Sequence, residues 1–219
     1  MDENFWHKRW AENSISFHEA KANPLLVTYF QELNLEKDSR VFIPLCGKTL
    51  AIAWFLSQGY QVVGAELSEL AIQQLFTELG VEPQITQIGD LKHYSAPDVD
   101  IFVGDIFNLT RQTLGTVDAI FDRAALVALP AKMRDQYTLH ITAITDSAPQ
   151  LLITFEYDQT RMDGPPFSVS GEEVNNHYHD TYDITPLASI EVAGMLKGKV
   201  PAKESVWHLK SRTQNSENA

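Results

Sequence analysis

The feature that most constrains this chain is an apolar run that enters a tight turn, followed by a second apolar run that ends on a carboxylate. Residues 41–44 are Val-Phe-Ile-Pro, and residues 45–49 form the turn Leu-Cys-Gly-Lys-Thr. An apolar helical segment at 50–58 comes next, and residues 61–66 form a second strand that ends on Glu66. Strand, turn, helix and strand in this order are typical of the first βαβ unit of an open α/β sheet.

The position of Glu66 predicts the kind of ligand. Ligands of open α/β sheets bind at the carboxyl ends of the strands, where an ionised carboxylate accepts hydrogen bonds from the two hydroxyls of a ribose. The turn matches no phosphate-binding motif, because Phe42 stands where a P-loop needs glycine and Gly47 is the only glycine in the turn. The sequence therefore favours a cofactor with a ribose but no pyrophosphate, such as S-adenosylmethionine. A plain strand-to-helix turn is the open alternative.

Strands and helices continue to alternate along the chain. Apolar residues recur at spacings of three and four near the N-terminus, which predicts a helical region at 1–35. Farther along we expect helices at 69–79 and 130–145, and strands at 101–105, 117–122, 151–157, 184–192 and 204–210. This order predicts an α/β fold with a mainly parallel sheet and helices on both faces. We expect one domain over 1–219, with a disordered tail at 211–219.

The charge balance and the single cysteine narrow the function classes. Lys and Arg number 17 against 29 Asp and Glu, and no basic cluster interleaves with aromatics, so we expect no nucleic-acid partner. Cys46 is the only cysteine, which excludes an intrachain disulfide and fits a reducing compartment. The sequence shows neither a signal peptide nor an apolar segment long enough to span a bilayer. We expect a cytoplasmic monomer with small-molecule partners and no membrane partner.

Three further motifs have chemistry that the sequence leaves open. Cys46 is a potential nucleophile, but nothing places a histidine beside it, and a buried turn residue is the alternative. His177 and His179 would face one side of an extended segment, but no further ligand group accompanies them, so we predict no metal site. Asp122 and Arg123 end an apolar strand, where the arginine either anchors a carboxylate or forms an ion pair within the chain.

Seven motifs in unbroken order make the pattern specific. They are the aromatic helix at 5–10, the connector that ends at Phe17, and the segments at 43–48, 63–69, 104–107, 122–129 and 163–169. Together they resemble the thiopurine S-methyltransferase family, most closely its bacterial members, over residues 6 to about 209. In that family a Pro-Leu-Cys-Gly-Lys turn stands where other class I methyltransferases carry a glycine-rich loop.

The resemblance implies a seven-stranded class I methyltransferase sheet with an antiparallel last hairpin. It also implies methyl transfer from S-adenosylmethionine to the sulfur of an aromatic or heterocyclic thiol, with S-adenosylhomocysteine as product. Carried over by motif, the cofactor contacts are Trp10, Leu45, Glu66 on the ribose, Asp105 and Ile106 beside the adenine, and Arg123. The walls of the acceptor pocket are Phe17, Pro165 and Pro166. This chain departs from some relatives at Asp105, where they have a smaller polar residue, and at Ala124, where they have glycine.

We expect an in-line displacement that needs alignment and a dry pocket rather than a strong base, so no general base is assigned. Arg123 either holds the cofactor carboxylate or balances an anionic acceptor. Residues 10–17 are predicted to fold over the occupied crevice as a lid. Alternative functions are methylation of an inorganic selenium or tellurium species or another small thiol, a non-catalytic cofactor-binding module, and a hydrolase based on Cys46.

Overall fold

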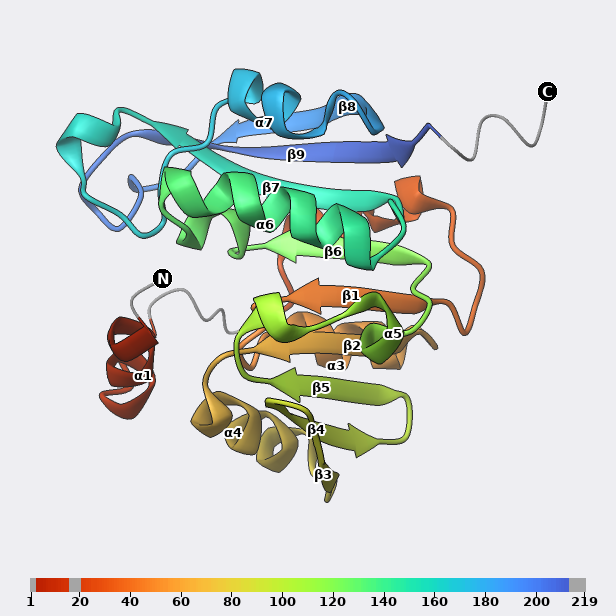
Figure 1. The fold of residues 1–219 in the computed structure, drawn as a ribbon. Helices are drawn as coiled ribbons and strands as arrows, with labels where there is room; N and C mark the ends of the chain where they lie inside the picture. The colour runs from red at the N-terminus through yellow and green to blue at the C-terminus, as the bar shows by residue number, and fades with distance from the viewer. Residues whose placement is uncertain (1–2, 16–20, 213–219) are drawn as a thin grey trace.

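The computed structural model describes residues 3–15 and 21–212, and within these ranges its centre is a nine-stranded sheet (Figure 1). The strand order is β3-β4-β5-β2-β1-β6-β7-β9-β8. Five neighbouring strands are parallel: β5 (Val99–Val103), β2 (Gln61–Glu66), β1 (Arg40–Pro44), β6 (Ala119–Arg123) and β7 (Gln150–Tyr157). Antiparallel strands flank them: β3 (Gln84–Ile88) and β4 (Leu91–Ala96) on one side, β8 (Tyr182–Glu191) and β9 (Ala202–Ser211) on the other.

Along the chain, the helices either precede the first strand or connect successive strands. The α-helices are α1 (Glu3–Ala11), α2 (Pro24–Tyr29), α3 (Leu50–Ser57), α4 (Glu69–Leu79), α5 (Arg111–Leu114), α6 (Ala131–Ile144) and α7 (Gly171–Tyr178). The 3-10 helices are η1 (Phe30–Leu33), η2 (Ile106–Asn108), η3 (Leu126–Ala128) and η4 (Gln159–Arg161). Figure 1 shows α1 beyond the arrowheads of β1, β2 and β5, so this helix lies at the carboxyl edge of the sheet.

The core lies on both faces of the sheet, because alternate residues of each buried strand point to opposite sides. In β1, Phe42 packs in a cluster with residues of α6 and α7, whereas Val41 and Ile43 pack with residues of α2, η1, α3 and α4. Every one of these β1 side chains is at most 2% exposed. Such near-continuous burial is what a parallel strand covered by helices on both faces requires, and it confirms the predicted α/β class.

The predicted number of seven strands is wrong, since the sheet has nine. The additional pair is the hairpin β3–β4, which joins the edge of β5 through β4. Its strands are connected by Gly89 and Asp90, a two-residue glycine-containing turn of the kind that favours hairpins. Every residue of β3 is exposed, so this strand has no continuous apolar run to reveal it.

Several other predictions are corrected by the structure. The segment with His177 and His179 is not extended, because α7 contains His177 and its C-cap is His179. Strand β9 takes in Ser211, the first residue of the predicted tail, and residues 213–219 lie outside the described ranges. Helices α1, α2 and η1 occur within residues 1–35 as expected. No helix in the described part of the chain is long and apolar enough to cross a membrane.

Candidate active site

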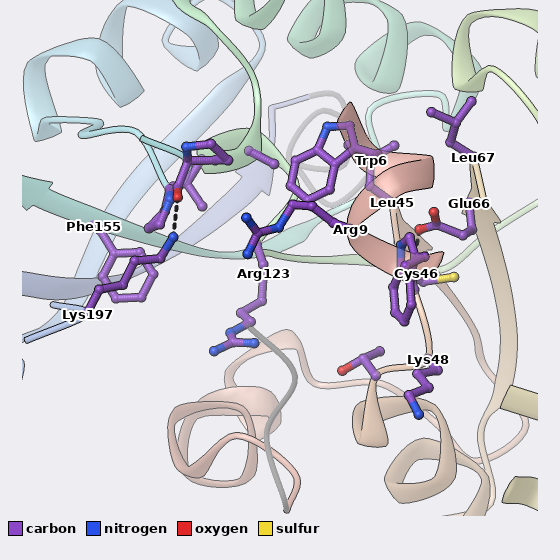
Figure 2. Close-up of a pocket in the computed structure, with 18 of the residues that line it drawn as sticks. Trp6, Arg9, Leu45, Cys46, Lys48, Glu66, Leu67, Arg123, Phe155 and Lys197 are labelled. Atoms are coloured by element: carbon purple, nitrogen blue, oxygen red, sulfur yellow. Dashed lines mark hydrogen bonds between the residues drawn. The ribbon is translucent and has the colours of Figure 1, made fainter. Parts of the chain in front are cut away.

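A cavity of about 560 Å³ opens at the carboxyl ends of β1, β2 and β6, with α1 forming one wall. Figure 2 shows Leu45, Cys46, Glu66 and Leu67 on one side of this cavity and Phe155 and Lys197 on the other. The Arg9 and Arg123 side chains lie between the two sides. We call the first side, lined by residues of the β1 turn and of the end of β2, the strand-end half. The second side is the loop half.

Two left-handed residues and a backbone hydrogen bond fix the conformation of the turn after β1. Leu45 and Gly47 both adopt left-handed conformations, with φ of 46° and 52°. The Gly47 N–H donates to Glu66 Oε2 at 2.8 Å, which ties the turn to the end of the neighbouring strand β2. A Cβ at position 47 would lie 2.9 Å from Cζ2 of Trp10, closer than van der Waals contact allows. Gly47 is therefore required by its backbone conformation and also by the Trp10 indole that packs against it.

Glu66 is a buried carboxylate held in a fixed orientation. It is 6% exposed, and besides Gly47 it accepts a hydrogen bond from the Ser68 N–H, Oε1 to N, at 2.9 Å. Burial raises the pKa of Glu66, while the hydrogen bonds from the Ser68 and Gly47 backbones oppose that rise. Each carboxylate oxygen offers two acceptor positions, so Glu66 can accept a donor from a ligand in addition to its backbone donors Gly47, Ser68 and Leu67.

Strand β6 ends on Arg123, whose side chain lies on the cavity wall. Ala124 follows with φ of 67°, the left-handed region in which glycine is the common residue. The preceding residue, Asp122, is fully buried, and its carboxylate accepts hydrogen bonds from Leu126 N–H and from the Tyr137 hydroxyl. Burial raises the pKa of Asp122 to about 6. The hydrogen bonds of the buried Asp122 carboxylate therefore fix the end of β6, where Arg123 lies.

The loop half brings together segments far apart in the sequence. Phe155 comes from β7, Pro165 and Pro166 from the loop after it, and Lys197 from the β8–β9 connection. Lys197 Nζ donates to the Pro165 carbonyl at 2.6 Å, the contact drawn as a dashed line in Figure 2. Partial burial lowers the pKa of Lys197, and the nearby Arg9 guanidinium adds to that effect. The Arg9 charge therefore lies close to Lys197, beside the apolar wall of the loop half.

Most of the predicted site residues meet in this cavity. Its lining includes Trp10, Leu45, Glu66, Arg123, Pro165 and Pro166. Asp105 and Ile106 follow β5, the neighbour of β2, but do not line the cavity, and their adenine contact stays a prediction. Asp105 instead accepts a hydrogen bond from the Phe107 N–H as the N-cap of η2. Phe17 lies outside the described residues.

Sequence reasoning missed several residues of the lining, namely Trp6, Arg9, Phe155, Leu196 and Lys197. A signal for the first two was present, because positions 6, 9 and 10 share one face of a helix and Trp10 was already assigned to the site. No local pattern marks Lys197, which reaches the cavity only because the long β8–β9 connection folds back over the Pro165 loop.

The family model for thiopurine S-methyltransferase matches residues 1–214 of the 219-residue chain. The chain belongs to the thiopurine S-methyltransferase family. A thiopurine S-methyltransferase of Xanthobacter autotrophicus is 53% identical over 95% of this chain and 99% of its own length. One from Teredinibacter turnerae is 48% identical over 99% of this chain and 100% of its own length.

Solved structures support the fold. A methyltransferase dependent on S-adenosylmethionine (SAM) from Anabaena variabilis is similar with a TM-score of 0.61, 15% identity, and 96% and 95% of the two chains covered. The 1,6-didemethyltoxoflavin-N1-methyltransferase of Burkholderia thailandensis, with S-adenosylhomocysteine bound, is similar with a TM-score of 0.64 and 16% identity over 95% of this chain and 87% of its own. The chain is a methyltransferase of this family, and its cofactor is S-adenosylmethionine.

The strand-end half fits that cofactor. The ribose hydroxyls require an acceptor, and the Glu66 carboxylate keeps acceptor capacity beyond its bonds from backbone N–H groups. The amino-acid carboxylate of the cofactor requires a cation, and Arg123 lies on the cavity wall. Leu45 and Trp10 line the same cavity with apolar side chains.

Proposed function

We propose that this enzyme methylates the sulfur of small aromatic or heterocyclic thiols. The observation that supports this acceptor is the composition of the loop half. Phe155 and the Pro165–Pro166 loop offer flat apolar surface for a ring, and Lys197, together with Arg9 and Arg123 at the boundary between the two halves, supplies positive charge. A thiolate attached to an aromatic ring has matching chemistry, an apolar body and a soft anionic sulfur.

In this proposal the cofactor binds in the strand-end half of the cavity and the acceptor binds in the loop half. On the strand-end side, Glu66 accepts the ribose hydroxyls and Leu45 and Trp10 contact the apolar parts of the nucleoside. When bound, S-adenosylmethionine supplies a methyl group already activated by its sulfonium sulfur. On the loop side, the cations favour the ionised form of the acceptor, because a positive charge lowers the pKa of a nearby thiol. The reaction then needs no dedicated general base.

Alignment and exclusion of water are the remaining tasks of the protein. Helix α1 contributes Trp6, Arg9 and Trp10 to the wall, and it comes from outside the sheet. We infer that residues 1–35 act as a lid, with α1 closing over the bound cofactor and acceptor. Hydrogen exchange of the α1 amides should slow by about tenfold when S-adenosylhomocysteine binds, and an unchanged rate would contradict a lid.

The proposal is tested by product analysis with methyl-labelled S-adenosylmethionine. The protein is incubated with a panel of aromatic thiols, heterocyclic thiols, aliphatic thiols, selenite and tellurite, and the labelled products are identified by mass spectrometry. We expect aromatic and heterocyclic thioethers to dominate. Labelling of the chalcogen species alone would replace the thiol assignment by the chalcogen alternative, and no labelling of any acceptor would favour a cofactor-binding module.

A further inference from the structure

Asp122 is a buried acid that does not line the cavity yet sits directly before a residue that does. It is 0% exposed at the carboxyl end of β6, and Arg123 follows it into the cavity wall. Its Oδ1 accepts a hydrogen bond from Leu126 N–H at 3.1 Å, and its Oδ2 accepts one from the Tyr137 hydroxyl at 2.7 Å. The carboxylate therefore connects the start of the turn to its end and to helix α6.

The turn closed by Asp122 supplies a continuous part of the cavity wall. Arg123 and Ala124 line the cavity before the Leu126 contact, and Val127 and Ala128 line it after that contact. Ala124 holds the left-handed backbone that an alanine adopts only when its surroundings impose it. The Asp122–Leu126 hydrogen bond spans this strained residue, so the bond opposes relaxation of the turn.

The same turn supports the loop half. The Val127 carbonyl accepts a hydrogen bond from Phe167 N–H at 2.6 Å, which attaches the Pro165–Pro166 loop to η3. Lys197 in turn donates to the Pro165 carbonyl. A chain of contacts thus runs from the buried carboxylate through η3 and the proline loop to the cation at the far side of the cavity.

We propose that Asp122, in its ionised form and together with Tyr137, is a positioning residue that holds the Arg123–Ala128 segment in the geometry required for methyl transfer to the acceptor. The inference rests on the proposed function, because the segment is assigned to the acceptor side. The ionised form is proposed because both carboxylate oxygens accept hydrogen bonds in this arrangement. A protonated carboxyl group converts one oxygen into a donor, which opposes one of the two hydrogen bonds.

The pKa of Asp122 depends on burial and on the groups that contact its carboxylate. Two buried phenols interact with Asp122, Tyr137 on α6 and Tyr178 on α7, and burial raises the pKa of both; the backbone N–H groups of Leu126 and Ala125 also act on its carboxylate. Its partner in the neighbouring strand β7 is Leu152, which is uncharged. The Tyr137 hydrogen bond lowers the pKa of Asp122, opposing the effect of burial.

The test is the pH profile of kcat/KM for the acceptor at saturating S-adenosylmethionine. The acceptor should be an electron-poor aromatic thiol that remains ionised down to pH 4, so that its own titration does not contribute. With a pKa of about 6 for Asp122, the wild-type value should fall by about tenfold between pH 7 and pH 5. Tyr137→Phe removes a hydrogen bond that favours the carboxylate, so the fall should begin at higher pH.

Two further variants separate positioning from folding. Asp122→Asn has no group to titrate, so its profile should lack this fall, at a plateau about tenfold below wild type at pH 8. The matched control is Tyr182→Phe, which removes another buried phenol whose hydroxyl donates to the Ala148 carbonyl and does not bond Asp122. Its profile should match wild type. A fall that keeps its position in Tyr137→Phe, or that persists in Asp122→Asn, overturns the proposal.

A second measurement tests the role of Asp122 in holding the turn independently of which acceptor is methylated. Hydrogen exchange of the Leu126 amide reports the Asp122 contact without any acceptor present. At pH 7.5, protection of this amide should be about tenfold lower in Asp122→Asn than in wild type and unchanged in Tyr182→Phe. If no thiol is methylated, the proposed function fails, but this exchange result still tests whether Asp122 holds the turn. Unchanged protection in Asp122→Asn overturns it.

Discussion

The two halves of the cavity are built in different ways. In the strand-end half, the functional groups between Leu45 and Ser68 are joined by hydrogen bonds from backbone N–H groups to one carboxylate. In the loop half, side chains from α1, β7, the proline loop and the β8–β9 connection meet across long sequence separations. The first arrangement is rigid and preformed, whereas the second depends on how several loops are placed.

This difference indicates that the two halves respond differently to substitution. A site made by main-chain hydrogen bonds at strand ends changes little when surface residues change. A site made of side chains on connecting segments changes with each substitution in those segments. We therefore expect substitutions in the strand-end half to weaken cofactor binding, and those in the loop half to change acceptor kinetics while leaving cofactor affinity intact.

The largest expected effect concerns Asp122, which precedes Arg123 at the boundary between the two halves. Its pKa of about 6 in the folded protein lies above the usual 3.8, so its contribution to stability is fully present below about pH 4 and is lost as pH rises through 6. The difference between these pKa values corresponds to about 3 kcal/mol. From pH 4 to pH 7, the free energy of unfolding of wild type should fall by about this amount relative to Asp122→Asn. Urea unfolding at both pH values measures this, and a constant difference would contradict it.

The second largest effect is expected from a substitution in the strand-end half. Glu66→Gln removes the charge that accepts the ribose hydroxyls, a loss of about 1.5–3 kcal/mol for a charge-assisted pair. The dissociation constant of S-adenosylhomocysteine should rise by roughly 10- to 100-fold in calorimetry. Glu69→Gln is the control, because Glu69 bonds Lys92 and Tyr94 and does not line the cavity. Equal affinities in wild type and Glu66→Gln would remove Glu66 from the site.

A subtler change to the same half is Gly47→Ala. The left-handed backbone costs an alanine about 1 kcal/mol, and the new methyl group contacts the Trp10 indole. Gly59→Ala is the matched control, since Gly59 has φ of 81° and no atom lies within 4 Å of the place that its new methyl group would take. Gly59→Ala should lose about 1 kcal/mol of unfolding free energy and Gly47→Ala at least as much, but only Gly47→Ala should weaken S-adenosylhomocysteine binding. Equal binding in the two variants would show that Trp10 is unimportant for the cofactor.

The smallest expected effect lies in the loop half. Lys197→Met removes one positive charge and the hydrogen bond to the Pro165 carbonyl. Because this side chain is solvent-accessible, the loss should be at most about 1 kcal/mol, a rise of up to fivefold in the KM of an anionic thiol. Cofactor affinity should not change. Lys199→Met, which alters a charge outside the cavity lining, is the control, and an equal rise in both variants would exclude a direct role for Lys197.

The contrast between the halves also explains how much the sequence revealed. Strand β2 and helix α4 have the predicted bounds because an apolar run ending on Glu66 and a capping Ser68 are local signals. The hairpin β3–β4 was missed because its outer strand is exposed and polar. In the site, Glu66 and Arg123 were identified from strand ends and family motifs, whereas Lys197 depends on a long-range loop contact. Local hydrogen bonding is encoded in short segments, but loop placement is not.

The central claim is that one cavity holds the nucleoside against Glu66 and the acceptor against the cationic loop half. A crystal structure of the complex with S-adenosylhomocysteine tests this most directly. We expect the ribose hydroxyls to lie within hydrogen-bond distance of the Glu66 carboxylate, the amino-acid carboxylate to lie at Arg123, and the thioether sulfur to face the loop half. A nucleoside bound outside this cavity, or a Glu66 carboxylate that touches no ligand atom, would contradict it.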